Sequence, residues 1–317
     1  MREAGPVEDA ELLHDAGMTR RRALGVFGVL AAGAAGLAGA VRALGSPAPR
    51  AKVAIGTTRL VERYGAGAGR VGEWWVPPQA APGGRLPTVV LVHGGYWRPG
   101  FDRHLEDAVA ADLAARGFLC WLPDYASLAA PWPTTLLDVA AAYDWLGQGR
   151  YAGSVDPARV AVVGHSAGGH LALWLVSRGR LPRRAPGGLP EAGRAAGSAP
   201  RPALAVGQAP VAALALGASQ GLGGGAVQAL LGGGPDKVPE RYRVADPVAL
   251  LPSRVRTVLV HGTADSTVPL QQSETYVAAA RAAGDHSELV RVPGGHFEHL
   301  DPRSEACARL RGALATL

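Results

Sequence analysis

The sequence predicts a doubly wound α/β fold, in which a mostly parallel sheet carries helices on both faces. Short apolar runs rich in Val and Leu alternate along the chain with longer Ala- and Leu-rich stretches at helical spacing. Such continuous apolar runs are typical of strands buried on both faces of a parallel sheet, and the alternation is typical of βαβ units. The predicted strands are 88–92, 118–122, 159–163, 203–206, 257–260 and 288–292, and the predicted helices are 104–116, 135–147, 167–178, 270–283 and 303–315.

A single domain over residues 49–317 accounts for this alternation. The chain has 317 residues, of which 48% are hydrophobic, and this is enough to bury one sizeable core. Residues 52–64 and 71–76 are predicted to be an N-terminal pair of strands. Two segments interrupt the pattern: 179–202, rich in Gly, Pro, Ala and Arg, is predicted to be a flexible surface loop, and the Gly-rich segment 210–240 lies where such folds often carry a cap over the site.

The charge and the cysteine content argue against several classes of protein. The formal net charge is +6, but the arginines form no dense block apart from the run 20–22, so we expect no nucleic-acid-binding face. The two cysteines, Cys120 and Cys307, are too few for a disulfide framework. Cys120 lies in an apolar run and is predicted to be a small buried hydrophobic residue, although a bridge to Cys307 remains open.

Residues 1–48 are predicted to be an export signal or a membrane anchor. A basic cluster is followed by the apolar stretch 23–41 and then by a small, Pro-containing exit. The paired Arg20 and Arg21, with Leu24 downstream, resemble a twin-arginine signal, so we expect export by that route. The apolar stretch is also just long enough to cross a bilayer, and cleavage and retention as an anchor both remain open. It has no polar face, which argues against a helix packed on the domain.

The strongest chemical motif is Gly164-His165-Ser166-Ala167-Gly168, which directly follows one predicted strand and directly precedes a predicted helix. This context is typical of a nucleophile elbow, in which a strained turn presents a serine hydroxyl. The two outer glycines are required there because larger side chains would collide with the neighbouring strand and helix. The N-terminus of the helix would stabilise developing negative charge. Ser166 is therefore the predicted nucleophile.

A second motif, His-Gly-Gly-Tyr-Trp at 93–97, follows the predicted strand 88–92 and is similar to the oxyanion loop of lipases and esterases. We expect the backbone N–H groups of Gly94, Gly95 and Ala167 to form the oxyanion hole. His93 is predicted to brace the loop by hydrogen bonding and not to act as the base. Three further side chains are expected to contact the substrate: Tyr96, Trp97 and His165.

Two loops after later strands supply the predicted acid and base. Asp265 lies in a loop that follows a strand, and the chain order serine, acid, histidine is the order that triads take on such sheets. His296 follows the last predicted strand and is the predicted base. His299 is the alternative base, less favoured because the next helix approaches it. Asp246 and Asp301 each precede a proline and are predicted to be turn or cap residues.

Together, the motifs at 93–97, 164–170 and 295–297 and the Asp265 loop resemble α/β-hydrolase serine esterases of the arylformamidase (kynurenine formamidase-like) or BD-FAE-type group. The resemblance extends from about residue 55 to the C-terminus. It implies the α/β-hydrolase fold, a Ser-Asp-His triad and an acyl-enzyme, with neither a metal nor an organic cofactor. It further implies substrates such as esters, aryl formamides or peptides.

The sequence therefore predicts a serine hydrolase that acts on esters, or on related acyl or formyl amides, of small molecules. Three alternatives remain: an arylformamidase, an exported prolyl-peptidase-like enzyme and a non-catalytic binding protein on the same scaffold. The predicted export argues against a kynurenine-pathway formamidase, and the chain has no room for a propeller domain. The presence of all three triad residues argues against a binding protein. No Cys or His cluster suggests a metal site, and the sequence does not predict the oligomeric state.

Overall fold

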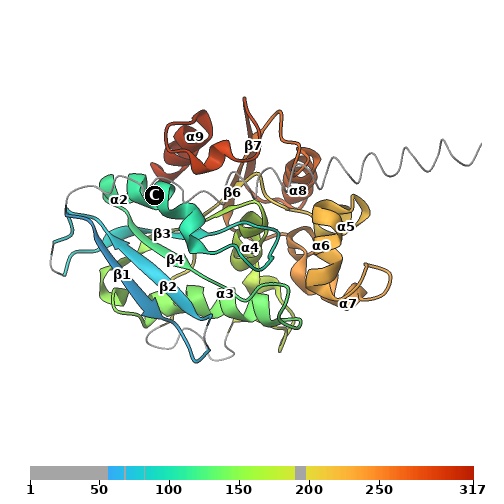
Figure 1. Cartoon of the computed structure of the whole chain (residues 1–317), viewed down its shortest axis with the longest axis horizontal. Helices are drawn as coiled ribbons and strands as arrows, with labels where there is room; N and C mark the ends of the chain where they lie inside the picture. The colour runs from blue at the N-terminus through green and yellow to red at the C-terminus, as the bar shows by residue number, and fades with distance from the viewer. Residues whose placement is uncertain (1–55, 68, 82, 190–197) are drawn as a thin grey trace, which may run out of the picture. The chain divides into compact units, whose positions relative to one another are not determined.

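The computed structural model describes residues 56–317, apart from 68, 82 and 190–197. The described residues form an eight-stranded sheet with helices on both faces (Figure 1). This confirms the predicted α/β class and the mostly parallel sheet. The export segment predicted at 1–48, including the apolar stretch 23–41, lies outside the described residues. Within the described part of the chain, none of the helices has both the length and the apolar character needed to cross a membrane.

The strands lie in the order β1-β2-β4-β3-β5-β6-β7-β8. The first two strands form the antiparallel part of the sheet, because β2 pairs antiparallel with both β1 and β4, and all the other pairs are parallel. Every strand predicted from the sequence is present. Their bounds are β1 (Thr58–Arg63), β2 (Val71–Val76), β3 (Leu86–Val92), β4 (Leu119–Pro123), β5 (Val155–His165), β6 (Leu204–Gln208), β7 (Arg256–Gly262) and β8 (Ser287–Val292).

The five predicted helices correspond to α2, α3, α4, α8 and α9. Their bounds are α2 (Asp107–Ala115), α3 (Thr134–Asp144), α4 (Ala167–Val176), α8 (Gln271–Ala282) and α9 (Glu305–Leu314). Short 3-10 turns precede α2 and α9 and also occur elsewhere. These turns are η1 (Arg103–Glu106), η2 (Trp145–Gly147), η3 (Ala152–Ser154), η4 (Arg178–Arg180), η5 (Pro247–Leu250) and η6 (Glu298–Leu300).

The two segments that interrupt the sequence pattern differ in structure. Segment 210–240 contains α5 (Leu214–Ser219) and α6 (Leu222–Leu231) and reaches the start of α7 (Pro239–Ala245). Residues 223–225, at the beginning of α6, are three glycines with left-handed backbone angles, and this conformation explains why the glycine-rich sequence gave no helical signal. Segment 179–202 includes part of η4, and its residues 190–197 are not described, so its predicted flexibility remains a prediction.

The apolar runs of the central strands are buried, as their sequence pattern predicts. Residues 89–92 of β3 are each 0 or 1% exposed. One face of the sheet forms a common core with α2 and α9, and this core includes both Cys120 and Cys307. The two thiols are free, so the predicted burial of Cys120 is confirmed and the bridge to Cys307 is not formed.

Candidate active site

The carboxyl ends of the parallel strands lie at one edge of the sheet, and the sequence motifs follow these ends. The loop 93–97 follows β3, Ser166 follows β5, Asp265 follows β7 and His296 follows β8. This edge is where open α/β sheets place their ligands and reacting groups. The topology therefore collects motifs that lie up to about two hundred residues apart in the chain.

Ser166 occupies a sharp turn between β5 and α4. Its backbone has φ 57° and ψ −117°, which is a strained conformation for a residue with a side chain. The turn is held in place because the Ser166 N–H donates to the Gln208 carbonyl at 2.8 Å, and the Ser166 carbonyl accepts from the Val211 N–H at 3.1 Å. The structure therefore shows the strand–turn–helix context that the motif predicts.

The glycines beside Ser166 are required by close backbone contacts. A Cβ at Gly164 would collide with the Gly168 carbonyl oxygen, and a Cβ at Gly168 would collide with the carbonyl oxygen of Val92. The second contact joins the start of α4 to the end of β3. Glycine at both positions thus allows the turn to form and brings the 93–97 loop close to Ser166.

The 93–97 loop packs directly against Ser166. A Cβ at Gly94 would lie 2.9 Å from the His165 carbonyl oxygen and 3.1 Å from the Ser166 Cβ. Among the described residues, no protein group accepts a hydrogen bond from the N–H of Gly94 or Gly95. The first residue of α4, Ala167, follows Ser166 directly. The backbone amides predicted for the oxyanion hole therefore lie in segments that meet at the serine.

His93 braces this loop. Its Nδ1 lies 2.8 Å from the Gly94 carbonyl oxygen, and because a carbonyl can only accept, the Nδ1 carries the proton. The ring stacks on Tyr125 at 4.2 Å between centroids, and the Tyr125 hydroxyl donates to the His93 carbonyl at 2.7 Å. Burial lowers the pKa of His93. These contacts agree with the predicted bracing role.

Asp265 and His296 form a close pair. The Nδ1 of His296 lies 2.7 Å from the Oδ2 of Asp265, and the Asp265 side chain has no exposed surface. The other oxygen, Oδ1, accepts from the N–H groups of Thr267 at 2.8 Å and Val268 at 2.9 Å. Burial by itself would raise the pKa of Asp265, but hydrogen bonds from His261, His296 and the Val268 amide lower it below its usual range. Asp265 is therefore held as a carboxylate.

His261 is a second imidazole beside Asp265, and its motif alone did not predict a role for it. Its Nε2 lies 2.9 Å from the Val268 carbonyl oxygen, so this nitrogen carries a proton, and it also lies 3.4 Å from Asp265 Oδ2. Its Nδ1 lies 2.7 Å from the Ser273 hydroxyl oxygen. The sequence feature that could have indicated this role is the position of His261 near the end of β7, four residues before Asp265 in the same motif.

The alternative base, His299, has no contact with Asp265. It is fully buried, and neither of its ring nitrogens has a hydrogen-bond partner. Burial, together with the nearby His296, lowers the pKa of His299 to about 3. Of the two candidate bases, only His296 is therefore oriented by the carboxylate.

His165 holds the loop that carries His296. The sequence predicts a substrate contact for His165, but its side chain lies inside the protein and only 3% of the residue is exposed. Its Nε2 lies 2.9 Å from the His296 carbonyl oxygen, and its ring lies 4.6 Å from the His296 ring. Burial and the neighbouring His296 hold the pKa of His165 well below its usual range. A neutral His165 thus joins the serine turn to the His296 loop.

The two aromatic residues predicted to line the pocket are also largely buried. Trp97 is 1% exposed, and its ring packs edge-on against His170 at 5.3 Å, so it contributes almost no surface to a ligand. Tyr96 is 5% exposed, and its hydroxyl donates to the Thr267 carbonyl at 2.7 Å. Tyr96 therefore ties the 93–97 loop to the loop of Asp265. The sequence could not reveal this packing, because it depends on segments far apart in the chain.

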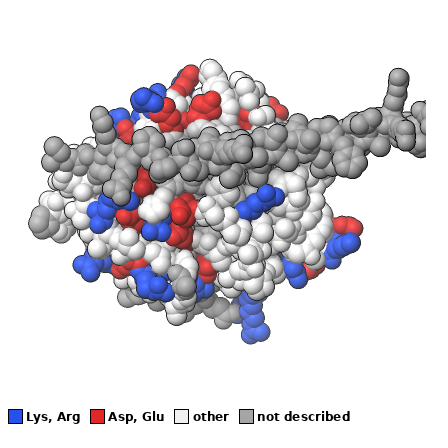
Figure 2. Space-filling model, in the orientation of Figure 1, with Lys and Arg blue, Asp and Glu red and all other residues white. Residues whose placement is uncertain are grey.

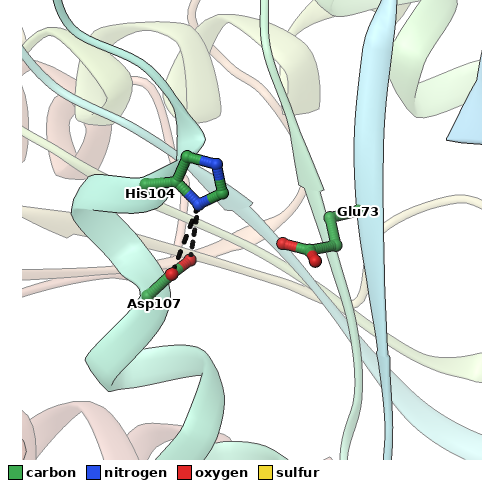
Figure 3. Close-up of side chains that lie close together, drawn as sticks. All are labelled: Glu73, His104 and Asp107. Carbon is green, nitrogen blue, oxygen red and sulfur yellow. Dashed lines mark hydrogen bonds and ion pairs between the residues drawn. The ribbon is translucent and has the colours of Figure 1, made fainter. Parts of the chain in front are cut away.

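One group of side chains outside this edge has the composition of a metal site. Glu73, His104 and Asp107 offer ligand atoms that lie within 4.8 Å of one another, and His104 points toward Asp107 (Figure 3). However, the guanidinium of Arg59 donates to both oxygens of Glu73, at 3.0 and 2.9 Å, and to Asp107 at 3.3 Å. Arg59 thus already pairs with both carboxylates, and the group is an ion-pair cluster.

The described surface shows no concentration of basic side chains in the view of Figure 2, where blue and red residues are interspersed. Several of the arginines are paired with carboxylates, as in the contacts of Arg116 with Asp112 and of Arg309 with Glu305.

Solved structures of esterases share this fold. Esterase B from Lactobacillus rhamnosis superposes with a TM-score of 0.74 at 20% identity, over 90% of this chain and 93% of that chain. A truncated carbohydrate esterase from gut microbiota gives a TM-score of 0.69 at 18% identity, over 82% of this chain and 95% of that one. At these identities the similarity establishes the α/β-hydrolase fold.

Similar sequences include two proteins of Mycobacterium tuberculosis. Esterase LipC is 30% identical over 68% of this chain and 54% of its own length, and Esterase LipQ is 30% identical over 44% of this chain and 34% of its own. The chain therefore spans about half, or less, of the length of these curated relatives.

A family model also matches the sequence. The BD-FAE model matches residues 76–279, which is more than half of the chain. The matched stretch contains the 93–97 loop, Ser166 and Asp265, whereas His296 lies beyond its end. Because the match covers most of the described domain and includes the turn at Ser166 and the loop packed against it, the chain belongs to the BD-FAE family.

Proposed function

We propose that this protein is a serine esterase in which Ser166 is the nucleophile, His296 the general base and Asp265 the residue that orients the base. The observation that carries the proposal is the 2.7 Å contact between Asp265 Oδ2 and His296 Nδ1, at the edge of the sheet where Ser166 occupies its strained turn. The names of the relatives and of the structural neighbours, which are esterases, support the same reaction.

The contact with Asp265 determines the tautomer of His296. Because the carboxylate accepts from Nδ1, the other ring nitrogen, Nε2, has a free electron pair and can take a proton from the Ser166 hydroxyl. The same carboxylate would stabilise the imidazolium that forms. Asp265 is suited to this because its own donors keep it ionised.

The reaction then has two halves. In the first, Ser166 Oγ bonds to the ester carbonyl carbon as its proton passes to His296, and the tetrahedral intermediate expels an alcohol that takes this proton. In the second, water attacks the acyl-enzyme with the same base and releases the acid. The negative oxygen of each intermediate would accept from the amides of Gly94, Gly95 and Ala167. Each such donor typically contributes about 3–4 kcal/mol to transition-state stabilisation.

We propose carboxylic esters of small molecules as the substrates. No metal or organic cofactor takes part in this mechanism. The resemblance to arylformamidases leaves N-formyl amides as a second class to assay, and the ester activity is favoured because the similar proteins are named as esterases.

We further propose that the protein is exported through its N-terminal segment, with the paired Arg20 and Arg21 as the targeting signal. Fractionation of cells that produce the full chain tests this proposal. Changing both arginines to lysine should retain the protein inside the cell, and unchanged export of that variant would contradict the twin-arginine route.

Replacement of the nucleophile is the direct test of the proposed esterase. Ser166→Ala should reduce the hydrolysis of p-nitrophenyl acetate by up to ~10⁶-fold and abolish labelling by a fluorophosphonate probe. Ser219→Ala, on an exposed serine of α5, is the matched control and should retain both properties. Turnover that persists in Ser166→Ala would reject the assignment.

A further inference from the structure

An exposed aromatic side chain lies next to the proposed base. Among the described residues, four large apolar side chains are exposed: Val61 (55%), Leu137 (39%), Leu189 (57%) and Phe297 (40%). The first three lie on β1, on α3 and in the segment after η4. Single exposed apolar residues are common and need no function. Phe297 differs from the other three because it directly follows His296.

The Phe297 ring lies against two histidine rings, those of His296 and His165. Its centroid is 5.2 Å from that of His296, with the two ring planes at 89°, and 6.3 Å from that of His165. The Phe297 carbonyl accepts from the Leu300 N–H at 3.0 Å, in the turn of η6. The ring is thus held edge-to-face against the imidazole while two fifths of the residue stay exposed.

The proposed chemistry places the alcohol part of an ester at this position. His296 must give its proton to the oxygen of the leaving alcohol, so that alcohol has to lie beside the imidazole. The acyl carbon is bonded to Ser166 at that moment, and its oxygen points toward the amides of Gly94 and Gly95. An apolar ring packed on His296 therefore lies beside the residue that would protonate the alcohol.

We propose that Phe297 is the specificity-determining residue for the leaving group, and that the enzyme prefers esters of apolar alcohols, such as benzyl or longer alkyl alcohols. This inference rests on the proposed function. Contact with an apolar alcohol would remove the exposed face of the ring from water, and a polar alcohol would gain nothing from that contact. Loss of such a contact typically changes kcat/KM by roughly ten- to two-hundredfold.

The test compares two series of substrates in the wild type, in Phe297→Ala and in Phe297→Leu. The first series keeps the acetyl group and changes the alcohol from benzyl to 2-methoxyethyl, two alcohols of similar acidity. The second keeps p-nitrophenol and lengthens the acyl group from acetyl to hexanoyl. Leu137→Ala is the matched control, because it removes an equally exposed apolar side chain on α3.

We expect Phe297→Ala to lower the benzyl-to-methoxyethyl ratio of kcat/KM by roughly tenfold and to leave the acyl-chain profile unchanged. Phe297→Leu should keep most of the ratio, and Leu137→Ala should keep all of it. An unchanged ratio in Phe297→Ala, or a change in the acyl profile instead, would overturn the role of Phe297.

Two outcomes distinguish a failure of this inference from a failure of the proposed function on which it rests. Ester turnover that persists in Ser166→Ala would reject the proposed triad, and the role of Phe297 with it. Turnover that depends on Ser166, with a leaving-group ratio that does not respond to Phe297, would reject the role of Phe297 alone. If Phe297→Ala does not fold, as judged by its melting curve, Phe297→Ser and Phe297→Leu provide the same comparison of a polar with an apolar side chain.

Discussion

Two buried carboxyl groups in this protein have pKa values that are shifted in opposite directions. Asp265 receives two backbone N–H groups and lies beside two imidazoles, and its pKa is lowered. Glu106, at the end of η1, is 1% exposed, and neither of its oxygens has a hydrogen-bond partner. Burial, with the nearby Asp107, raises the pKa of Glu106 to about 8. Burial raises the pKa of both carboxyl groups, and the hydrogen-bond donors that Asp265 has and Glu106 lacks account for the opposite outcome at Asp265.

Within this comparison of carboxyl groups, the largest effect should come from removing the charge of Asp265 while its shape is kept. In Asp265→Asn the amide can donate to His296, so the imidazole takes the tautomer that cannot accept the serine proton. We expect kcat for p-nitrophenyl acetate to fall by roughly 10⁴-fold with little change in the melting temperature. A loss of less than tenfold would show that Asp265 does not orient the base.

The second effect concerns stability and is expected at Glu106. Between the ordinary value of 4.5 and about 8, the unfolded chain carries an ionised Glu106 while the folded protein keeps it protonated. The folded state then binds more protons, so this residue makes the free energy of unfolding fall by about 1.4 kcal/mol for each pH unit in that range.

Glu106→Gln cannot ionise, so its gain in stability over the wild type should grow as the pH rises from 6 to 8. Urea unfolding at pH 6, 7 and 8 measures this difference. Glu240→Gln, which changes an exposed carboxylate at the start of α7, is the control and should run parallel to the wild type. A constant difference between Glu106→Gln and the wild type over this range would contradict the raised pKa.

The same two residues show what the sequence could and could not predict. Asp265 was predictable because its motif follows a buried strand and because serine, acid and histidine occur in the expected order. Glu106 looked like an ordinary acidic residue near the start of a helix. Its burial depends on the packing of η1 against β3 and β4, which no local pattern records.

Sequence patterns predicted the elements and the motif positions, but not the surroundings of individual side chains. The strands were predicted well because apolar runs report burial on both faces directly. The direction of the Trp97 side chain was not predicted, because it depends on contact with α4 through His170. His261 and Phe297 stood within motifs that were recognised, yet their roles depend on distances to Asp265 and His296 that only the folded chain defines.

The smallest effect is expected at His261, which tests whether a single donor contributes to the difference between Asp265 and Glu106. His261→Phe removes one donor from Asp265 and so moves its surroundings a step toward those of Glu106. Because this N–H lies 3.4 Å from a carboxylate that keeps its other donors, we expect only about a tenfold loss of kcat/KM at pH 8, caused by less exact positioning of Asp265 against His296. A carboxylate with one donor fewer should also hold the imidazolium form of His296 more strongly. The fall of activity on the acid side should therefore begin at a higher pH.

Ser273→Ala is the matched control, because it removes the partner of His261 Nδ1 and leaves the Nε2 proton facing Asp265. Profiles of kcat/KM between pH 5 and 9 distinguish the two roles of His261. A shifted acid limb in His261→Phe and an unshifted one in Ser273→Ala would show that the imidazole acts through the carboxylate. Equal losses with no shift in either variant would show instead that His261 only packs the end of β7.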